Sequence, residues 1–376
     1  MTEISRGLEG IFVAETKLCR IDGQKGELVY AGYDIFDLAE NSTFEEVCFL
    51  LWNQRLPNKA ELDALHAQLR QDRPLTDMNA RLLKELVGVV KPMRGLEICV
   101  EALGALDPKS SDLSNSQLRV TAAKLTAQMA TVVATYDRLR RGLAPVAPRD
   151  DLGHAANFLW MLKGEEPTEL EKRTFDVAMV LHAEHEMNAS TFSAIVTAST
   201  LSDMYSAIAS AIGTLKGPLH GGANEAVYKI LEAIGTEENV EPYIEALLAR
   251  GERMMGFGHR VYKTTDPRAI ILHKLGEELA LTSPDAHYFH LSNKVEQFLE
   301  KRLAGRKLYP NVDFYSASVY KMLGIPADLY TPIFALARIG GWTAHLMEQY
   351  ADNRLVRPNA AYAGAEGLRY APVEAR

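Results

Sequence analysis

Cysteine is scarce in this sequence: Cys19, Cys48 and Cys99 are the only three among 376 residues. They are odd in number, far apart and set in ordinary apolar patterns, so neither a disulfide framework nor a cysteine-based metal site is indicated. We interpret them as buried thiols of a protein in a reducing compartment, which predicts a cytoplasmic location.

The sequence also has no block of lysine and arginine, and its formal net charge is −8. Nucleic acid is therefore not expected as a partner. A small anionic ligand is still compatible with this charge, because a few arginines in a pocket act locally.

Long apolar runs are missing as well. The longest weakly charged stretch, residues 189–215, contains Asp203 and many serines and threonines. It predicts closely packed buried helices and no membrane span. The first seven residues have neither the apolar core of a signal peptide nor the basic pattern of a transit peptide.

Strand patterns are rare, and helix signals dominate. Two short alternating segments within residues 16–33 flank a glycine-containing turn at 22–26, which predicts a small β-hairpin. Capping boxes predict helix starts at Thr43, Asn58 and Thr168. We expect an all-α fold with this one N-terminal hairpin, and the chain length favours two domains. The clearest predicted helices cover 115–140, 168–185, 225–233, 240–253, 267–281, 285–303, 316–323 and 332–350.

The least ordinary run is 216–225, Lys-Gly-Pro-Leu-His-Gly-Gly-Ala-Asn-Glu. Gly217 and Pro218 end one helical pattern, and another begins near Ala223. His220 therefore lies just before a helix N-terminus, whose positive partial charge disfavours a protonated imidazole. A neutral His220 can donate a hydrogen bond to a carbonyl oxygen that gains negative charge. A helix-break loop with an incidental histidine is the equally weighted alternative.

The second unusual run is 255–268, in which His259 follows two glycines and Arg268 begins a helix. The third glycine of a dinucleotide-binding loop is missing, which argues against a Rossmann site. A histidine and an arginine on one turn suit a ligand with a carbonyl and a carboxylate. The alternative is a capped turn at residues 265–267 with solvated charges.

The third run is 309–316, where Asp313 has apolar and aromatic neighbours. A partly desolvated carboxylate is a stronger base than one in water. The alternative, of comparable weight, is that Asp313 or Asn311 caps the helix expected near Ser316.

Two further histidines and two arginines complete the candidates. His182 and His185 are three residues apart but do not form a zinc signature, so no metal site is predicted. We expect His182 on a helix surface, and spacing alone favours a His185 ring that is hydrogen-bonded to backbone. Arg338 interrupts an apolar helix and needs a partner there, whereas Arg357 precedes a proline in a loop.

The order of three motifs resembles the citrate synthase family. They are Gly-Pro-Leu-His-Gly-Gly-Ala-Asn-Glu at 217–225, Gly-Phe-Gly-His-Arg-Val-Tyr-Lys at 256–263 with Asp-Pro-Arg-Ala at 266–269, and Pro-Asn-Val-Asp-Phe-Tyr-Ser at 310–316. The resemblance extends over nearly the whole chain. It implies a two-domain helical fold, with a large domain at 1–221 and 325–376, a small domain at 222–324 and an active site between them.

The resemblance also implies a role for each matching residue. Asp313 removes a proton from the methyl group of acetyl-CoA, His220 stabilises the enolate or enol, and His259 polarises the ketone of oxaloacetate. The oxaloacetate carboxylates are held by His185, Arg268, Arg338 and, from the other subunit of a homodimer with shared active sites, Arg357. Coenzyme A thioester acts as a co-substrate and no cofactor is permanently bound, with Lys263, Arg306 and Lys307 as the expected contacts of coenzyme A.

Two positions depart from the family pattern: Ala31 and Ile195 stand where arginine is common. They put local salt bridges in doubt and leave the reaction unaffected. The alternative activity is that of a 2-methylcitrate synthase, which uses propionyl-CoA with the same residues. One methylene in a pocket is worth only ~1–3 kcal/mol of discrimination, so the sequence leaves the acyl donor open.

Overall fold

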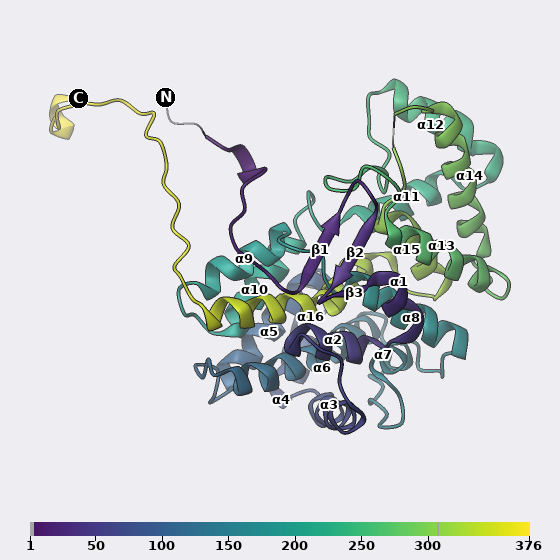
Figure 1. Ribbon diagram of the computed structural model, residues 1–376, viewed down its shortest axis with the longest axis horizontal. Helices are drawn as coiled ribbons and strands as arrows, with labels where there is room; N and C mark the ends of the chain where they lie inside the picture. Colours follow the sequence, from purple (N-terminus) through teal and green to yellow (C-terminus); the bar gives the residue numbers. More distant parts are fainter. Residues whose placement is uncertain (1–3, 307) are drawn as a thin grey trace.

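The computed structural model of the protein describes residues 4–306 and 308–376. Helices dominate this part of the chain, as expected, and the predicted hairpin is present beside them (Figure 1). Its strands are β1 (Cys19–Asp22) and β2 (Glu27–Tyr30), paired antiparallel. A third strand that the sequence did not predict, β3 (Tyr33–Asp34), adds to β2. It has only two residues, which is too short for an alternating pattern to be recognised.

The described residues up to Leu215 form ten α-helices, one of which has the predicted bounds 115–140. All three capping boxes are formed, with Thr43, Asn58 and Thr168 as N-caps. The helices are α1 (Ile35–Asn41), α2 (Phe44–Asn53), α3 (Lys59–Asp72), α4 (Asp77–Leu86), α5 (Pro92–Leu106), α6 (Asn115–Arg140), α7 (His154–Lys163), α8 (Glu169–His182), α9 (Ala189–Ala198) and α10 (Met204–Leu215).

The described residues after Leu215 add six α-helices. They are α11 (Ala223–Ile234), α12 (Val240–Ala249), α13 (Pro267–Ala280), α14 (Ala286–Arg302), α15 (Val312–Met322) and α16 (Tyr330–Ala351). Helices α11 to α15 gather at one end of the molecule, and α12 and α14 lie farthest from the rest (Figure 1). No helix of the described residues is long and apolar enough to cross a membrane.

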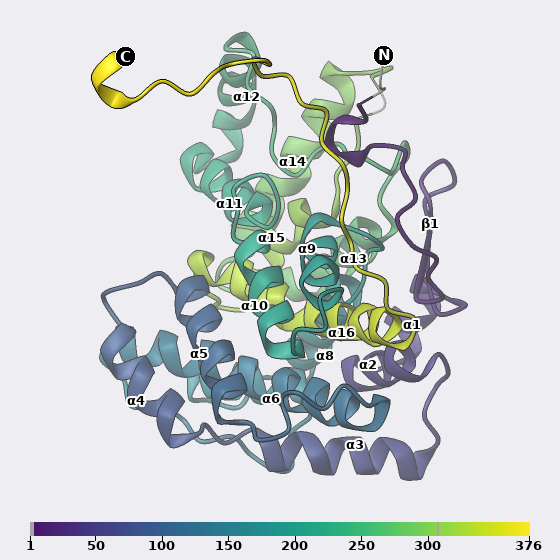
Figure 2. The same cartoon turned by 90° about the vertical axis from the view of Figure 1, so that its left-hand side faces the viewer.

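Helix α16 lies at the centre of the fold. Its first eighteen residues are all buried, and it packs against α2, α6, α8, α9, α10 and α11. A helix that is apolar around its whole circumference is stable only inside a core. Beyond Ala351 the chain leaves the helical body as an exposed extended segment (Figure 2).

The three cysteines are free and buried, as the sequence predicted. Burial raises the pKa of the Cys19, Cys48 and Cys99 thiols. They are therefore kept as neutral, unreactive core residues.

Candidate active site

One cavity of about 790 Å³ lies between the N-terminal segment 8–15, α9, the end of α16 and residues 352–358. A second, central cavity of about 730 Å³ is lined by residues of the three predicted motifs. The central cavity is lined by segments that are far apart in sequence: the loop after α8, the turn between α10 and α11, the turn before α13, and helices α15 and α16. Six of the predicted site residues line it: His185, His220, His259, Arg268, Asp313 and Arg338.

Backbone pairing brings the second and third motifs together. Phe257 and Pro310 form an isolated antiparallel bridge, and Gly258 N–H donates to the Tyr309 carbonyl at 2.8 Å. Gly256 has a φ of 79°, and a Cβ there would lie 2.7 Å from Val227 and 2.9 Å from Phe314. Only glycine permits this close approach, which places His259 and Asp313 around the same cavity.

Asp313 is the second residue of α15, because the helix begins at Val312 and not near Ser316 as expected. The cap is Asn311, whose side chain accepts the N–H of Asp313 at 3.0 Å. The Asp313 carboxylate is therefore not needed as the N-cap. Burial raises its pKa to about 6, opposed by Arg268 and reinforced by Asp266. Such a carboxylate is ionised at neutral pH and more basic than one in water.

His220 lies in the turn three residues before the start of α11, as predicted. Its Nε2 accepts the backbone N–H of Ser190 at 3.3 Å and lies 2.8 Å from the Ser190 hydroxyl. An accepting Nε2 places the proton of the neutral ring on Nδ1. Burial lowers the pKa of His220 to about 4, followed by repulsion from Arg338. The ring is thus an uncharged donor at neutral pH.

His259 is held by its own turn. Its Nδ1 accepts the backbone N–H groups of Val261 and Tyr262 at 3.0 and 3.2 Å, so the neutral ring carries its proton on Nε2. Burial lowers the pKa of His259 to about 4, followed by repulsion from Arg268. His259 and His220 are therefore neutral together, with opposite ring nitrogens protonated.

His185 lies beside His259, with ring centroids 5.1 Å apart. Among the described residues its Nε2 has no hydrogen-bond partner although it is shielded from solvent. The backbone-bonded ring that spacing favoured is therefore not seen at this nitrogen. Burial, and then repulsion from Arg268, holds the pKa of His185 well below its usual value. A shielded nitrogen without a partner is a natural contact for a bound ligand.

The two arginines are almost completely buried, with exposed fractions of 2% for Arg268 and 1% for Arg338. Arg268 forms a two-point ion pair with Asp266, at 3.0 and 2.7 Å. Burial opposes ionisation of Asp266, but Arg268 outweighs it and keeps the pKa of Asp266 below its usual value. Arg338 donates from Nε to the His182 carbonyl at 2.6 Å. Both guanidinium groups line the cavity, and only Arg268 is paired with a carboxylate, so this side of the cavity favours an anionic ligand.

His182 is not on a helix surface, so that expectation was wrong. It is fully buried at the end of α8, with Nδ1 2.7 Å from the Ala178 carbonyl and its ring edge-on to Phe334. The helix also ends at His182, three residues earlier than expected. Local sequence gave no sign that α16 would cover this end of α8.

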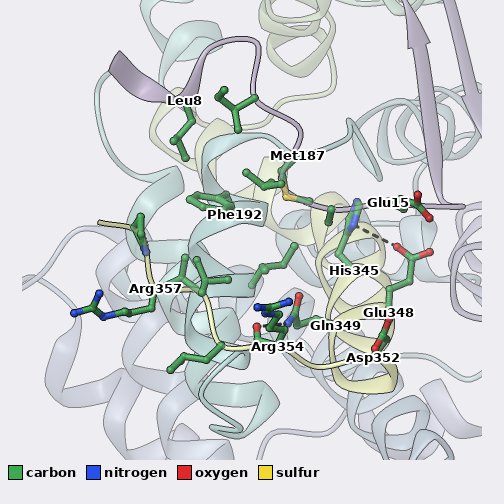
Figure 3. Close-up of a pocket in the computed structure, with 18 residues that line it drawn as sticks. Leu8, Glu15, Met187, Phe192, His345, Glu348, Gln349, Asp352, Arg354 and Arg357 are labelled. Atoms are coloured by element: carbon green, nitrogen blue, oxygen red, sulfur yellow. Dashed lines mark hydrogen bonds and ion pairs between the residues drawn. The ribbon is translucent and has the colours of Figure 1, made fainter. Parts of the chain in front are cut away.

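The remaining predicted contacts do not line the central cavity. Arg357 is exposed, bonds to Asn359 at 3.1 Å and lines the neighbouring cavity (Figure 3). Lys263 and Arg306 are exposed, and Lys307 lies outside the described residues. Ala31 and Ile195, the two departures from the family pattern, are also away from the central cavity.

Several residues that shape the site were missed by the sequence reading. The backbone N–H of Ser190 fixes the tautomer of His220, and the Ser190 hydroxyl accepts from Trp342 Nε1 at 3.1 Å. Asp266 appeared only as part of a capped turn, yet it also holds Arg268. In the described residues, no group of three or more His, Cys, Asp or Glu side chains is arranged to hold a metal ion.

Comparisons with known proteins agree with the geometry. Residues 7–359 match the family described as citrate synthase, C-terminal domain. The citrate synthase of Haloferax volcanii is 50% identical, over 100% of this chain and 99% of the relative. That of Deinococcus radiodurans is 46% identical over 100% of both chains. The 2-methylcitrate synthase of Mycobacterium tuberculosis is 40% identical, over 97% of this chain and 91% of the relative.

A solved structure is similar over the full length of the chain. Citrate synthase from Thermoplasma acidophilum, in a ternary complex with carboxymethyl coenzyme A and oxaloacetate, superimposes with a TM-score of 0.94 and 34% identity, over 100% of both chains. With these relatives and the family match over most of its residues, the chain belongs to the citrate synthase family.

Proposed function

We propose that the central cavity is where this enzyme joins acetyl-CoA to oxaloacetate and releases citrate and coenzyme A. The observation that carries this proposal is that Asp313, His220 and His259 line one cavity, and their protonation states fit the reaction. Asp313 is an ionised base with a pKa of about 6, and His220 and His259 are neutral donors with pKa values of about 4. This is the set needed to deprotonate a weak carbon acid and stabilise the resulting oxyanion.

In the proposed mechanism Asp313 takes a proton from the methyl group of acetyl-CoA. His220, through Nδ1–H, donates to the thioester oxygen as charge develops there. His259, through Nε2–H, donates to the ketone oxygen of oxaloacetate, so that its carbon accepts the enolate. A positioned base contributes ~10²–10⁴-fold, and one donor to an oxyanion is worth roughly 3–4 kcal/mol. Water then hydrolyses the citryl thioester.

The anionic substrate is assigned to the cationic side of the cavity. Arg268, Arg338 and His185 hold the carboxylates of oxaloacetate, which matches the burial of the two guanidinium groups. For coenzyme A we propose Lys263, Arg306 and Lys307. Lys263 supports this role by its exposed position in the His259 turn, where its N–H donates to the Gly23 carbonyl at 2.8 Å.

We further propose a cytoplasmic homodimer in which Arg357 of the partner subunit completes the site. The exposed apolar side chains of the C-terminal segment support it: Tyr362, Leu368 and Tyr370 are each more than 70% exposed, as expected of a segment that packs on another chain. Met187 lines both the central cavity and the cavity beside Arg357. A partner segment that sits there would lie next to the substrate.

The proposed division is a large domain at 1–221 and 325–376 and a small domain at 222–324. Each part supplies essential groups: His185, His220 and Arg338 come from the first, and His259, Arg268 and Asp313 from the second. Closure of one on the other would exclude water from the enolate. Oxaloacetate is then expected to bind first.

The test is the initial rate of coenzyme A release with acetyl-CoA and with propionyl-CoA, each with and without oxaloacetate. We expect release only with oxaloacetate, and a higher kcat/KM for acetyl-CoA. A preference for propionyl-CoA would establish the 2-methylcitrate synthase alternative. Release that does not depend on oxaloacetate would refute the condensation.

A further inference from the structure

One face of α16 contacts the segment 182–190, which carries His185. The residues on this face are three or four positions apart, which places them along one side of a helix. Arg338 bonds to the His182 carbonyl, Gly341 N–H donates to the Ala183 carbonyl at 3.1 Å, and Trp342 donates to the Ser190 hydroxyl. The next residue on the face is His345, and its partner is Glu184.

Glu184 is fully buried and directly precedes His185. Its Oε1 accepts the backbone N–H of His185 at 2.8 Å and lies 3.1 Å from His345 Nε2. The Tyr30 hydroxyl donates to the Glu184 carbonyl at 2.7 Å. The side chain and the backbone of this residue are thus both anchored, one to α16 and the other to β2.

Glycine at position 341 makes this arrangement sterically feasible. A Cβ at Gly341 would lie 2.1 Å from Glu184 Oε2 and 2.4 Å from the Ala183 carbonyl. Real contacts of this kind are never so short, so any larger residue would push the carboxylate and the loop away from α16. The loop can therefore contact α16 at this point only because residue 341 has no side chain.

The loop also needs an external restraint. Glu186, immediately after His185, has a φ of 56°, which is a sparsely populated conformation for a residue with a side chain. Such a conformation persists only where surrounding contacts impose it. The hydrogen bond from His185 N–H to Glu184 is one of these contacts, next to the strained residue.

His345 is the ionisable partner of Glu184, with its Nε2 3.1 Å from Glu184 Oε1. Burial opposes its protonation, but Glu184 and then Glu348 outweigh burial and the nearby Arg338, so the pKa of His345 lies above its usual value. Glu186 also faces this cluster. On the far side, His345 Nδ1 lies 3.8 Å from Glu348 (Figure 3), which in turn binds the Thr16 hydroxyl at 2.8 Å.

We propose that Glu184, paired with His345, is a positioning residue that sets where the His185 ring lies in the central cavity. It does not touch the reacting atoms. It acts on oxaloacetate binding through the backbone of His185. This inference rests on the proposed role of His185 as an oxaloacetate contact.

The first test is the kinetics of Glu184→Ala, with Glu184→Gln as the conservative variant. We expect Glu184→Ala to raise the KM for oxaloacetate by roughly tenfold or more, because a misplaced substrate contact is costly. The KM for acetyl-CoA should change little. Glu184→Gln keeps an acceptor for the His185 N–H, so it should fall between Glu184→Ala and the wild type.

The matched control is Asp137→Ala. Asp137 is also a fully buried carboxylate with cationic partners, Arg140 at 2.6 Å and Arg141 at 2.8 Å, but it lies on α6 away from the central cavity. We expect this variant to lower the melting temperature without changing the KM for oxaloacetate. The comparison separates positioning from general loss of stability.

If Glu184→Ala does not fold, Glu184→Gln decides the question. A second variant, Gly341→Ala, displaces the Glu184 carboxylate together with the Ala183 carbonyl without altering any titratable group. It should also raise the KM for oxaloacetate. If folded variants lose stability but keep the wild-type KM for oxaloacetate, or if both KM values rise together, the positioning role is overturned. A wild-type protein without oxaloacetate-dependent release would instead overturn the proposed function, and this inference with it.

Discussion

Replacing Asp313 by asparagine should make the protein more stable and almost inactive. The wild-type carboxyl has a pKa that rises from its ordinary 3.8 to about 6 on folding. Between these values the folded state binds more protons than the unfolded state, so stability is lost as pH rises from about 4 to above 6. The total loss from this one group is about 3 kcal/mol.

Asparagine has the same shape but no charge to desolvate. At pH 8 the Asp313→Asn variant should therefore exceed the wild type in free energy of unfolding by up to about 3 kcal/mol. The lost interaction of the carboxylate with the N-terminus of α15 reduces this gain by ~0.3–1 kcal/mol. Near about pH 3, where the carboxyl is mostly protonated in both states, the advantage should largely disappear.

The rate should change in the opposite direction. Loss of a general base is expected to lower kcat by ~10²–10⁴-fold. In the wild type, kcat/KM should fall as pH drops through about 6, because only the ionised carboxylate accepts the proton. The buried charge of Asp313 therefore lowers the stability of the protein while it supports the rate, as is common where a charge is buried for function.

The assay pairs urea unfolding at several pH values with oxaloacetate-dependent release of coenzyme A. Asp77→Asn is the control, since Asp77 is an exposed carboxylate in the first turn of α4. It should leave activity unchanged and give no gain in stability. Asp313→Asn with wild-type turnover, or with lower stability than the wild type at pH 8, would refute the reasoning.

Three further predictions follow from the same geometry. His220→Ala should lower kcat by ~10²–10³-fold through loss of one oxyanion donor, measured as coenzyme A release at saturating substrate; an unchanged kcat would contradict its role. Arg268→Leu leaves Asp266 buried without its cation, so we expect a loss of ~3–5 kcal/mol in urea unfolding and a higher KM for oxaloacetate. Burial, then Glu45, raises the pKa of Asp176 above its usual value. Wild-type stability is thus lost as pH rises above the ordinary range of an aspartate, and Asp176→Asn should have the higher melting temperature at pH 8 and little advantage near about pH 3.

The sequence by itself determined most of the local structure. The capping boxes at Thr43, Asn58 and Thr168 and the glycine turn of the hairpin depend on residues within three or four positions of one another, so their hydrogen bonds are readable from the chain. The same holds for the turn that carries His220. Its glycines and proline end one helix before the next begins.

The six residues around the central cavity were also predicted, but no local feature of the sequence shows that they come together in space. Their motif order resembled a known family, whereas spacing alone left a capping role open for Asp313. The structure assigns that role to Asn311, because α15 begins four residues earlier than the sequence pattern indicated. A helix start is set by which backbone N–H groups find acceptors.

What only the tertiary structure decided is the environment of each group. The pKa values of Asp313, His220 and His259 depend first on burial by other segments of the chain, and no sequence window contains those segments. His182 was misjudged for the same reason, since α16 covers it from 156 residues away. Desolvation and long-range pairing are properties of the packed core, so Glu184, His345 and Ser190 acquire their partners only when α16 is in place.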